Sequence, residues 1–354
     1  MSVKQTFFRR ARNGAKILCE NGRPGAIWMT TVTETEDDEY DEHSHMSTAI
    51  YSHPDCQRHE MGESHPESPA RLQAIEDQLI LARLDGLIER REPPLAELPA
   101  LMRNHSAAAI ARVRDNLPGP GQYYPLDADT SLNAHSYQAA LRAAGAAMAA
   151  TDAVIAGDID NAFCATRPPG HHARPGGAMG FCLFNNIALA ALHALESHGL
   201  TRVAIIDFDV HHGNGTAESF QGDARVLMAS FYQHPFYPYT EPEPESATRV
   251  NIPVPARSNG EVVRKLVREH WLPALHAFKP EMIFISAGFD AHREDDLGEM
   301  ALVEADYAWM TREIMAIARQ YANGRIVSCL EGGYNLSALG RSVVAHVKAL
   351  AELD

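Results

Sequence analysis

Two acids and a histidine alternate where a short apolar run of the sequence ends. Residues 203–206 are all apolar, and Asp207, Asp209 and His211 follow at every second position. Side chains two residues apart point to the same side of a strand, so these three should lie together. Burying two carboxylates beside an imidazole is costly unless a cation is present. The pattern therefore favours a metal site over a solvated, Asp-rich loop.

Two adjacent histidines form a second candidate site. His171 and His172 follow Arg167-Pro168-Pro169-Gly170, in which two prolines and a glycine predict a rigid turn. A single histidine would more often be a surface or core residue, but an adjacent pair behind such a turn favours a function. One imidazole can take a proton from water while the other stabilises developing charge.

Two further clusters each follow an apolar run. Asp290 comes shortly after residues 282–286, and Tyr334 follows the Glu331-Gly332-Gly333 segment. Alone, Tyr334 would more often be a packing residue, but a Gly-Gly turn can present its hydroxyl at an open site. Asp290 supplies a third candidate metal ligand.

Asp209, His211 and Asp290 together offer one imidazole and two carboxylates. Three protein ligands leave positions open for water and substrate, which is typical of a catalytic zinc and not of a structural one. An oxygen-rich ligand set also tolerates Fe2+. The sequence therefore indicates one divalent cation, with zinc preferred.

Short apolar runs alternate with longer segments of helical periodicity over most of the chain. Such runs are typical of buried parallel strands. The sequence predicts a single-domain α/β fold with a doubly wound, mainly parallel sheet flanked by helices. In these sheets ligands bind beyond the carboxyl ends of the strands, where all four clusters fall. The predicted strands are residues 49–51, 162–165, 203–206, 226–230, 282–286 and 326–330, and the predicted helices are residues 70–88, 136–156, 187–197, 261–278, 304–321 and 339–353.

Composition narrows the classes of function. The chain has 354 residues and a formal net charge of -15, which argues against nucleic-acid binding because phosphates need a basic surface. A negative field suits cationic substrates such as lysine-rich peptides or polyamines, although simple solubility explains the charge equally well. No apolar run is long enough for a membrane span, and no secretory signal is recognisable. Five cysteines, an odd number, disfavour a disulfide framework and indicate a reducing, cytoplasmic location.

The first residues differ from the rest of the chain. Residues 1–25 are basic, residues 34–42 are acidic, and neither segment has a sustained apolar period. The sequence therefore predicts a mostly disordered extension over residues 1–46 and a catalytic domain over residues 47–354. The arginine-rich start is also compatible with an organelle presequence.

The four clusters together resemble the histone deacetylase superfamily, most closely its class II branch and the bacterial histone deacetylase-like and acetylpolyamine amidohydrolases. The resemblance begins near residue 49 and runs to the C-terminus. It implies the arginase/deacetylase-type fold and zinc-dependent removal of acetyl or related acyl groups from amines, above all from acyl-lysine of proteins or peptides. The matching stretches are residues 65–69 with Arg71, 167–172, 180–182 with Asn185 and Asn186, 207–216, 286–290 and 331–335.

The resemblance also implies a catalytic role for each clustered residue. His172 would be the general base and His171 its electrostatic partner. Asp207 would orient His171, and Asn214 would orient His172. Many relatives carry aspartate in place of Asn214, and a neutral amide raises the basicity of His172 less than a carboxylate would. Tyr334 would donate a hydrogen bond to the substrate carbonyl and its oxyanion.

Zinc, potassium and a substrate channel follow from the same resemblance. Asp209, His211 and Asp290 would hold the zinc. The predicted channel residues are Gly180, Phe181, Tyr237 and Leu297, and ordinary core packing remains open as an alternative for the two aromatic residues. A structural potassium would lie at Asp207, Asp209, His211 and Ser230, and a second would lie near Phe220, Asp223 and Val226.

Three other functions remain open. An acetylpolyamine deacetylase is the nearest, although the polyamine-selective eukaryotic relatives carry glutamate at the position of Leu297. A ureohydrolase such as arginase would need two metals, and a non-catalytic reader of acylated proteins would lose the base or the tyrosine. The substrate could be an acetylated lysine peptide, an acetylated polyamine or a small amide, and the sequence leaves a homo-oligomer open.

Overall fold

A computed structural model of the chain describes residues 9–10, 16–17 and 47–353. The chain divides into two units, Met1–Ser44 and His45–Asp354. In the first unit, strands β1 (Arg9–Arg10) and β2 (Lys16–Ile17) pair in antiparallel orientation. The other residues of the predicted extension lie outside the described residues, so its disorder stays a prediction.

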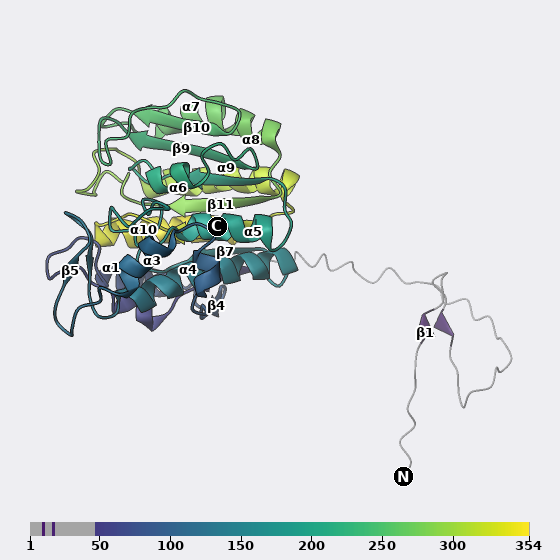
Figure 1. The fold of residues 1–354 in the computed structure, drawn as a ribbon. Coiled ribbons are helices and arrows are strands. Elements are labelled where there is room, and N and C mark those ends of the chain that lie inside the picture. The colour runs from purple at the N-terminus through teal and green to yellow at the C-terminus, as the bar shows by residue number, and fades with distance from the viewer. Residues whose placement is uncertain (1–8, 11–15, 18–46, 354) are drawn as a thin grey trace, which may run out of the picture. The chain divides into compact units, whose positions relative to one another are not determined.

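The second unit is built around an eight-stranded sheet in which all neighbouring strands are parallel (Figure 1). Its order is β10-β9-β8-β11-β12-β7-β3-β4, so the chain winds outward in both directions as predicted. The strands are β3 (Thr48–Tyr51), β4 (Glu89–Arg91), β7 (Asn161–Cys164), β8 (Val203–Asp207), β9 (Val226–Gln233), β10 (Arg249–Val254), β11 (Met282–Ala287) and β12 (Ile326–Leu330).

Helices occupy the connections between these strands. They are η1 (Pro54–Gln57), α1 (Ala70–Leu81), α2 (Leu98–Leu101), α3 (Ala107–Arg114), α4 (Ser136–Ala156), α5 (Asn186–Glu196), α6 (Asn214–Ser219), α7 (Gly260–Leu266), the π-helical η2 (Val267–Trp271), α8 (Leu272–Phe278), α9 (Glu304–Tyr321) and α10 (Leu336–Leu350). A small antiparallel pair, β5 (Tyr124–Pro125) and β6 (Ser131–Leu132), lies in the loop before α4.

The helices cover both faces of the sheet because alternate strand residues point to opposite faces. Ile206 of β8 joins the hydrophobic cluster with α1, α9 and α10, whereas Ile205 joins the cluster with α4 and α5. Helix α4 is long and apolar enough to cross a membrane by length and composition, but 67% of its apolar window is buried inside the protein. These are the properties of a core helix.

The structure confirms the predicted fold and differs from the prediction mainly at the sheet edges. All six predicted strands are present with small shifts at their ends. The two edge strands, β4 and β10, were not predicted. Strand β4 consists of Glu89, Arg90 and Arg91, whose charges suit an edge strand open to solvent. The single helix predicted over residues 261–278 is instead divided by the π-turn η2 into α7 and α8.

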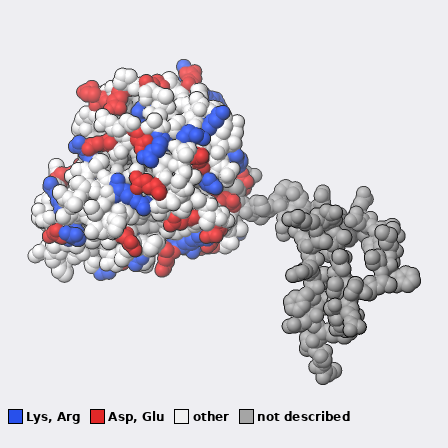
Figure 2. Space-filling view, turned by 45° about the vertical axis from the view of Figure 1, so that its right-hand side comes forward, with Lys and Arg blue, Asp and Glu red and all other residues white. Residues whose placement is uncertain are grey.

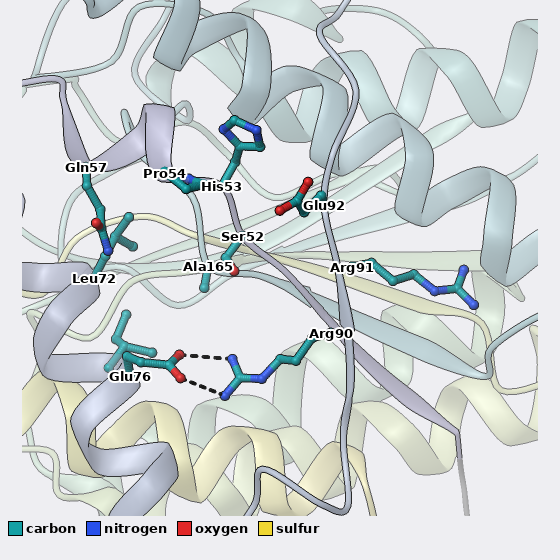
Figure 3. A pocket seen from close by; sticks show the side chains of 11 residues that line it. Ser52, His53, Pro54, Gln57, Leu72, Glu76, Arg90, Arg91, Glu92 and Ala165 are labelled. Carbon is teal, nitrogen blue, oxygen red and sulfur yellow. Dashed lines mark hydrogen bonds and ion pairs between the residues drawn. The ribbon is translucent and has the colours of Figure 1, made fainter.

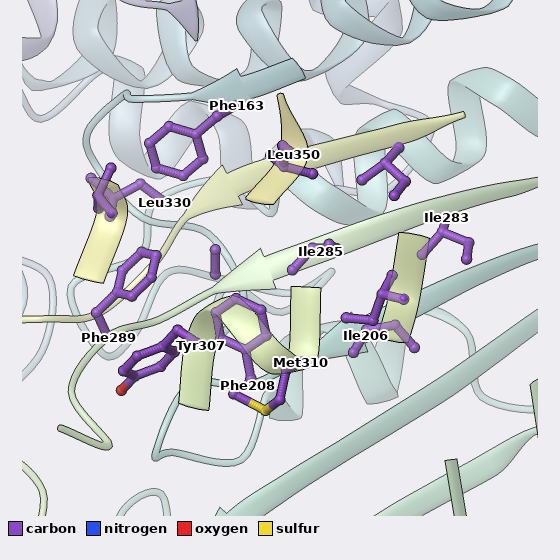
Figure 4. Close-up of a cluster of buried hydrophobic side chains, with 14 of the residues drawn as sticks. Phe163, Ile206, Phe208, Ile283, Ile285, Phe289, Tyr307, Met310, Leu330 and Leu350 are labelled. Carbon is purple, nitrogen blue, oxygen red and sulfur yellow. The ribbon is translucent and has the colours of Figure 1, made fainter. Parts of the chain in front are cut away.

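Two buried aromatic residues, Phe208 and Phe289, lie next to the acids in sequence and belong to the hydrophobic core (Figure 4). Phe208 lies between Asp207 and Asp209, and its ring centre is 5.9 Å from that of Phe289. Phe289 in turn lies 5.1 Å from the ring of Tyr307 on α9. Both phenylalanines are fully buried, so they fix to the core the two loops that carry Asp209 and Asp290.

Candidate active site

The four polar clusters meet at one edge of the sheet. They follow β7, β8, β11 and β12, which are neighbours in the order β8-β11-β12-β7. The register places Ser286 of β11 between Asp207 of β8 and Cys329 of β12. Because parallel strands end at the same edge, the loops that carry the candidate residues adjoin one another.

Asp209, His211 and Asp290 converge, with one potential ligand atom of each within 4.8 Å of the others. His211 Nδ1 lies 3.0 Å from Asp209 Oδ1 and 3.2 Å from Asp290 Oδ2. Both carboxylates are fully buried. Backbone N–H groups hold them in place: Gly332 donates to Asp209 Oδ2, and Val210 donates to Asp290 Oδ1.

These three side chains fit a divalent cation. Asp290 Oδ2 is buried and lacks a hydrogen-bond partner among the described residues, so a cation would satisfy it. One imidazole and two carboxylates make a mixed ligand set that suits zinc and tolerates Fe2+. Glycines leave the space free, because a Cβ on Gly288 would lie 2.1 Å from Asp209 Oδ2 and one on Gly332 would lie 2.0 Å from Asp290 Oδ2.

Gly332→Ala is expected to weaken zinc binding by about 10–100-fold, because the added methyl group must displace the Asp290 carboxylate. Zinc content after dialysis against a competing chelator would be measured by elemental analysis. Gly176→Ala is the matched control, since a Cβ at Gly176 meets no heavy atom within 4 Å. Equal zinc retention by the two variants would contradict this ligand set.

His171 lies between two carboxylates. Its Nδ1–H donates to Asp207 Oδ2 at 3.0 Å, and its Nε2 is 3.8 Å from Asp209 Oδ2. Burial lowers the pKa of His171, but the charges of Asp209, Asp207 and Glu331 outweigh burial and raise this pKa well above its ordinary value. Asp207 and Glu331 are outside the candidate ligand set. His171 is therefore the charged member of the pair.

His172 has the opposite electrostatic environment. Burial, followed by the charges of His171 and His211, lowers the pKa of His172 well below its ordinary value. Its Nδ1–H donates to Asn214 Oδ1 at 2.7 Å, while the Asn214 amide N–H points to Met179 Sδ. A neutral imidazole with its proton on Nδ1 keeps a lone pair on Nε2. His172 can therefore accept a proton.

Tyr334 is held by the loop after β12. Its backbone N–H and that of Asn335 donate to Asp295 Oδ2 at 2.6 and 2.9 Å. The Arg71 guanidinium lies 4.9 Å from the centre of the Tyr334 ring. Burial raises the pKa of Tyr334 well above its ordinary value, and Arg71 offsets only part of this effect. The hydroxyl is therefore protonated at neutral pH and able to donate a hydrogen bond.

Glu331 joins the histidine pair to the sheet, a role that sequence reasoning missed. Its Oε2 accepts the backbone N–H groups of Gly170 and His171 at 2.7 and 3.0 Å, and its Oε1 accepts the Ser286 hydroxyl at 3.2 Å. Burial raises the pKa of Glu331 to about 7, although the charge of His171 lowers it. The sequence does show Glu331 directly after an apolar strand, which marks it as a candidate site residue. Its hydrogen-bond partners could not be predicted, because they are distant in sequence.

A fully buried ion cluster supports the Tyr334 loop. Glu67 pairs with Arg71 at 3.1 Å and makes a second, shorter pair with Arg167. Arg71 Nε also donates to the Gly333 carbonyl at 2.7 Å. All three charged side chains are 0% exposed. The resemblance included these residues, but no role was predicted for them.

A cavity of about 230 Å³ opens onto the site. Its lining includes the catalytic candidates His172 and Tyr334, the candidate metal ligand His211, and the four predicted channel residues Gly180, Phe181, Tyr237 and Leu297. Four further lining residues were not predicted, namely Asp129, Phe236, Tyr239 and Asp296. The structure thus brings the predicted channel residues to the same cavity as the catalytic candidates.

Aromatic rings form much of the cavity wall. The Phe181 ring meets Tyr334 edge-on at 5.8 Å, and the Tyr237 ring meets His172 at 5.3 Å. Gly180 adopts a φ of +55°, and a Cβ there would lie 2.6 Å from His172 Cδ2. The position therefore requires glycine, because any side chain would displace the candidate base.

The residues assigned to potassium lie in two places. Ser230 of β9 is the register partner of Asp207, so the first set lies beside the acid cluster. In the second set, the backbone carbonyls of Phe220 and Val226 accept hydrogen bonds from the guanidinium of Arg249. These two carbonyls are already engaged by a cationic side chain, so the second set does not fit a free potassium ion.

Another cavity, of about 470 Å³, lies beside β4 and α1, away from these clusters (Figure 3). Its lining includes Glu76 and Arg90, which form an ion pair at 3.0 Å. It contains neither a candidate metal ligand nor a catalytic histidine of the site above. The smaller cavity therefore remains the candidate active site.

Acidic and basic side chains are interspersed on the face of the protein that Figure 2 shows. No broad basic area is visible on this face.

The parallel sheet with its acid–histidine–tyrosine cluster at the carboxyl edge is the arginase/deacetylase-type α/β fold. Residues 65–350 match the histone deacetylase domain. The chain belongs to the histone deacetylase family. This membership supports a deacetylase hydrolase, as the resemblance implied.

Relatives from several lineages cover most of the chain. "Histone deacetylase 14, chloroplastic" of Arabidopsis thaliana is 38% identical over 82% of this chain and 74% of its own length. A "Probable deacetylase" of Archaeoglobus fulgidus is 37% identical over 87% and 88%. The "Histone deacetylase-like amidohydrolase" of Pseudomonas aeruginosa is 36% identical over 77% and 73%. A crystal structure of the HDA15 HD domain has a TM-score of 0.80 and 33% identity, covering 87% of this chain and 89% of that one.

Proposed function

We propose that this protein is a zinc-dependent deacetylase that removes acetyl or related acyl groups from lysine side chains. The observation that carries the proposal is the difference between the two histidines. A neutral His172, with a free lone pair, lines the same cavity as the protonated Tyr334 hydroxyl and the candidate ligand His211. A proton acceptor and a hydrogen-bond donor beside a metal site are the parts that amide hydrolysis requires.

The residues divide the reaction between them. Bound zinc would supply Lewis-acid polarisation of the acyl carbonyl and of the attacking water. His172 accepts a proton from that water as it attacks the carbonyl carbon. The Tyr334 hydroxyl donates a hydrogen bond to the carbonyl oxygen as negative charge develops there. His171, held in its charged form by Asp209 and Asp207, stabilises this charge. His172 then gives the proton it took from water to the leaving amine. The other proton of the water is released from the new carboxyl group to the amine, so the products are a carboxylate and a protonated amine.

The cavity supports a slender acyl-amine substrate. Its aromatic walls suit the aliphatic stem of an acyl-lysine, and its volume of about 230 Å³ is large enough for such a side chain. Leu297 in the lining agrees with the residue found in broad lysine deacetylases of the family.

An acetylpolyamine is the second candidate substrate. The carboxyl-bearing residues Asp129 and Asp296 both line the cavity, and they would attract a second amine on the substrate. The side chain of an acyl-lysine has only its acylated nitrogen and therefore offers no second amine to these carboxylates. Relative rates on the two substrate classes therefore separate the candidates.

The test compares kcat/KM for an acetyl-lysine peptide and for acetylputrescine with zinc-loaded protein. We expect hydrolysis of the peptide to be faster, to stop on removal of the metal with a chelator, and to return on addition of zinc. Tyr334→Phe should bind zinc normally but react about 10²–10³-fold more slowly, because it lacks the donor to the oxyanion. Activity that survives complete metal removal would refute zinc dependence, and faster hydrolysis of acetylputrescine would favour the second candidate.

A further inference from the structure

Arg249 links three segments of the chain through backbone carbonyls. It begins β10, and its guanidinium donates to the Phe220 carbonyl and, at 3.2 Å, to the Val226 carbonyl. The same guanidinium nitrogen that contacts Val226 also reaches the Thr248 carbonyl at 2.8 Å. Phe220 follows the last residue of α6, and Val226 begins β9. Three carbonyl oxygens therefore face one cationic group.

Such a convergence of carbonyl oxygens creates a strongly negative position. Carbonyl dipoles that point to one place form the usual protein site for a hard cation such as potassium. Here the planar guanidinium, with several N–H donors in a fixed arrangement, satisfies the carbonyls instead. Burial lowers the pKa of Arg249, whereas the charges of Glu243 and Asp223 raise it. Arginine keeps its proton under ordinary conditions, so the positive charge is permanent.

We propose that the Arg249 guanidinium is a built-in cation that takes the place of a second potassium ion in this protein. The carbonyls of Phe220, Val226 and Thr248 would form a monovalent-cation site only after this side chain is removed. The proposal concerns the fold around α6 and does not rest on the proposed substrate or on zinc.

Arg249 holds the C-terminal end of helix α6 in place. Helix α6 carries Asn214, the partner of His172, at its first residue and ends just before Phe220. The bond to the Phe220 carbonyl therefore anchors the C-terminal end of the short helix that orients the candidate base. Arg249 also lines a polar cavity of about 720 Å³ that includes Asn214, so water and small ions could reach the carbonyls once the guanidinium is removed.

The first test compares the potassium dependence of thermal stability in wild type and Arg249→Met. In buffer whose only cation is N-methylglucamine, the variant should melt about 5 °C below wild type, because three partly buried carbonyls lose a charged donor. Added KCl should recover most of this difference, with choline chloride as the ionic-strength control. Any potassium bound beside Asp207 is present in both proteins, so the difference between the two responses isolates the carbonyl site.

Arg225→Met is the matched control. Arg225 pairs with Asp223 at 2.7 Å in the same loop, but its guanidinium makes no hydrogen bond to the three carbonyls. This variant should show the wild-type potassium response. Equal stability and equal potassium response in Arg249→Met and wild type would overturn the proposal. A loss of stability in Arg249→Met that no monovalent cation restores would also count against it.

The second test needs no variant and decides the question if Arg249→Met does not fold. Wild-type crystals grown with thallium(I) or rubidium should show no anomalous peak among the Phe220, Val226 and Thr248 carbonyls. The guanidinium of Arg249 should be ordered there instead. A peak within coordination distance of these carbonyls, with Arg249 displaced, would refute the proposal that the Arg249 guanidinium takes the place of a potassium ion.

Discussion

Replacing His172 with alanine is expected to lower kcat by about 10²–10⁴-fold while zinc remains bound. The reason is that burial, followed by the charge of His171, keeps His172 neutral, so it is the imidazole able to accept a proton. Zinc content should not change, because His172 is outside the cluster of Asp209, His211 and Asp290. Steady-state rates on an acetyl-lysine peptide and metal analysis of the same sample would measure both quantities.

His276→Ala provides the control for removing an imidazole. His276 lies on α8, is exposed, and bonds to the Tyr321 hydroxyl at 3.0 Å, away from the cavity. Its loss should leave kcat within about twofold of wild type, as expected for a surface substitution. If His172→Ala retained a tenth or more of wild-type kcat, the general-base role would pass to another group.

Replacing Glu67 with glutamine is expected to lower the free energy of unfolding by about 3–5 kcal/mol. The substitution keeps the size of the side chain but leaves the buried charges of Arg71 and Arg167 without their carboxylate. The guanidinium groups lower the pKa of Glu67 to about 2 although burial raises it. Wild type should therefore have this contribution in full above about pH 4.5 and lose it as pH falls toward 2. The variant lacks it at every pH.

Glu76→Gln is the matched control. Glu76 lies on α1, the helix that also carries Arg71, and the substitution removes a solvent-exposed ion pair with Arg90. It should cost less than about 1 kcal/mol, the range for surface ion pairs. Urea unfolding at pH 7 and pH 4 would give the free energy of unfolding of wild type and of each variant. Glu67→Gln should also lose activity, since Arg71 holds the Gly333 carbonyl next to Tyr334. A difference below 1 kcal/mol between the two variants would show that the buried cluster contributes little.

The convergence of Asp209 and His211 could be predicted because both residues directly follow the strand that the apolar run 203–206 identifies. Strand β8 ends at Asp207, so the loop after it, and not strand alternation, brings the two side chains together. The parallel order of the sheet then brought Asp290 to the same edge. The roles of these residues in catalysis remain predictions that the variants above test.

The supporting residues could not be predicted because their partners are remote in sequence. Arg71 and Gly333 are 262 positions apart, and Arg249 lies 29 positions from Phe220. No local pattern encodes such pairings, whereas apolar periodicity encodes helices and strands directly. The edge strand β4 was missed for a related reason, since its charged residues carry no apolar signal.

The catalytic groups are distributed over the loops that follow four separate strands, β7, β8, β11 and β12. None of these loops can be correctly placed until its strand is paired with its neighbours, so no fragment of the sheet contains all the catalytic groups. Catalytic activity should therefore be lost in one step with the fold. The thermal inactivation profile should superimpose on the cooperative melting transition, with no partly active intermediate between them.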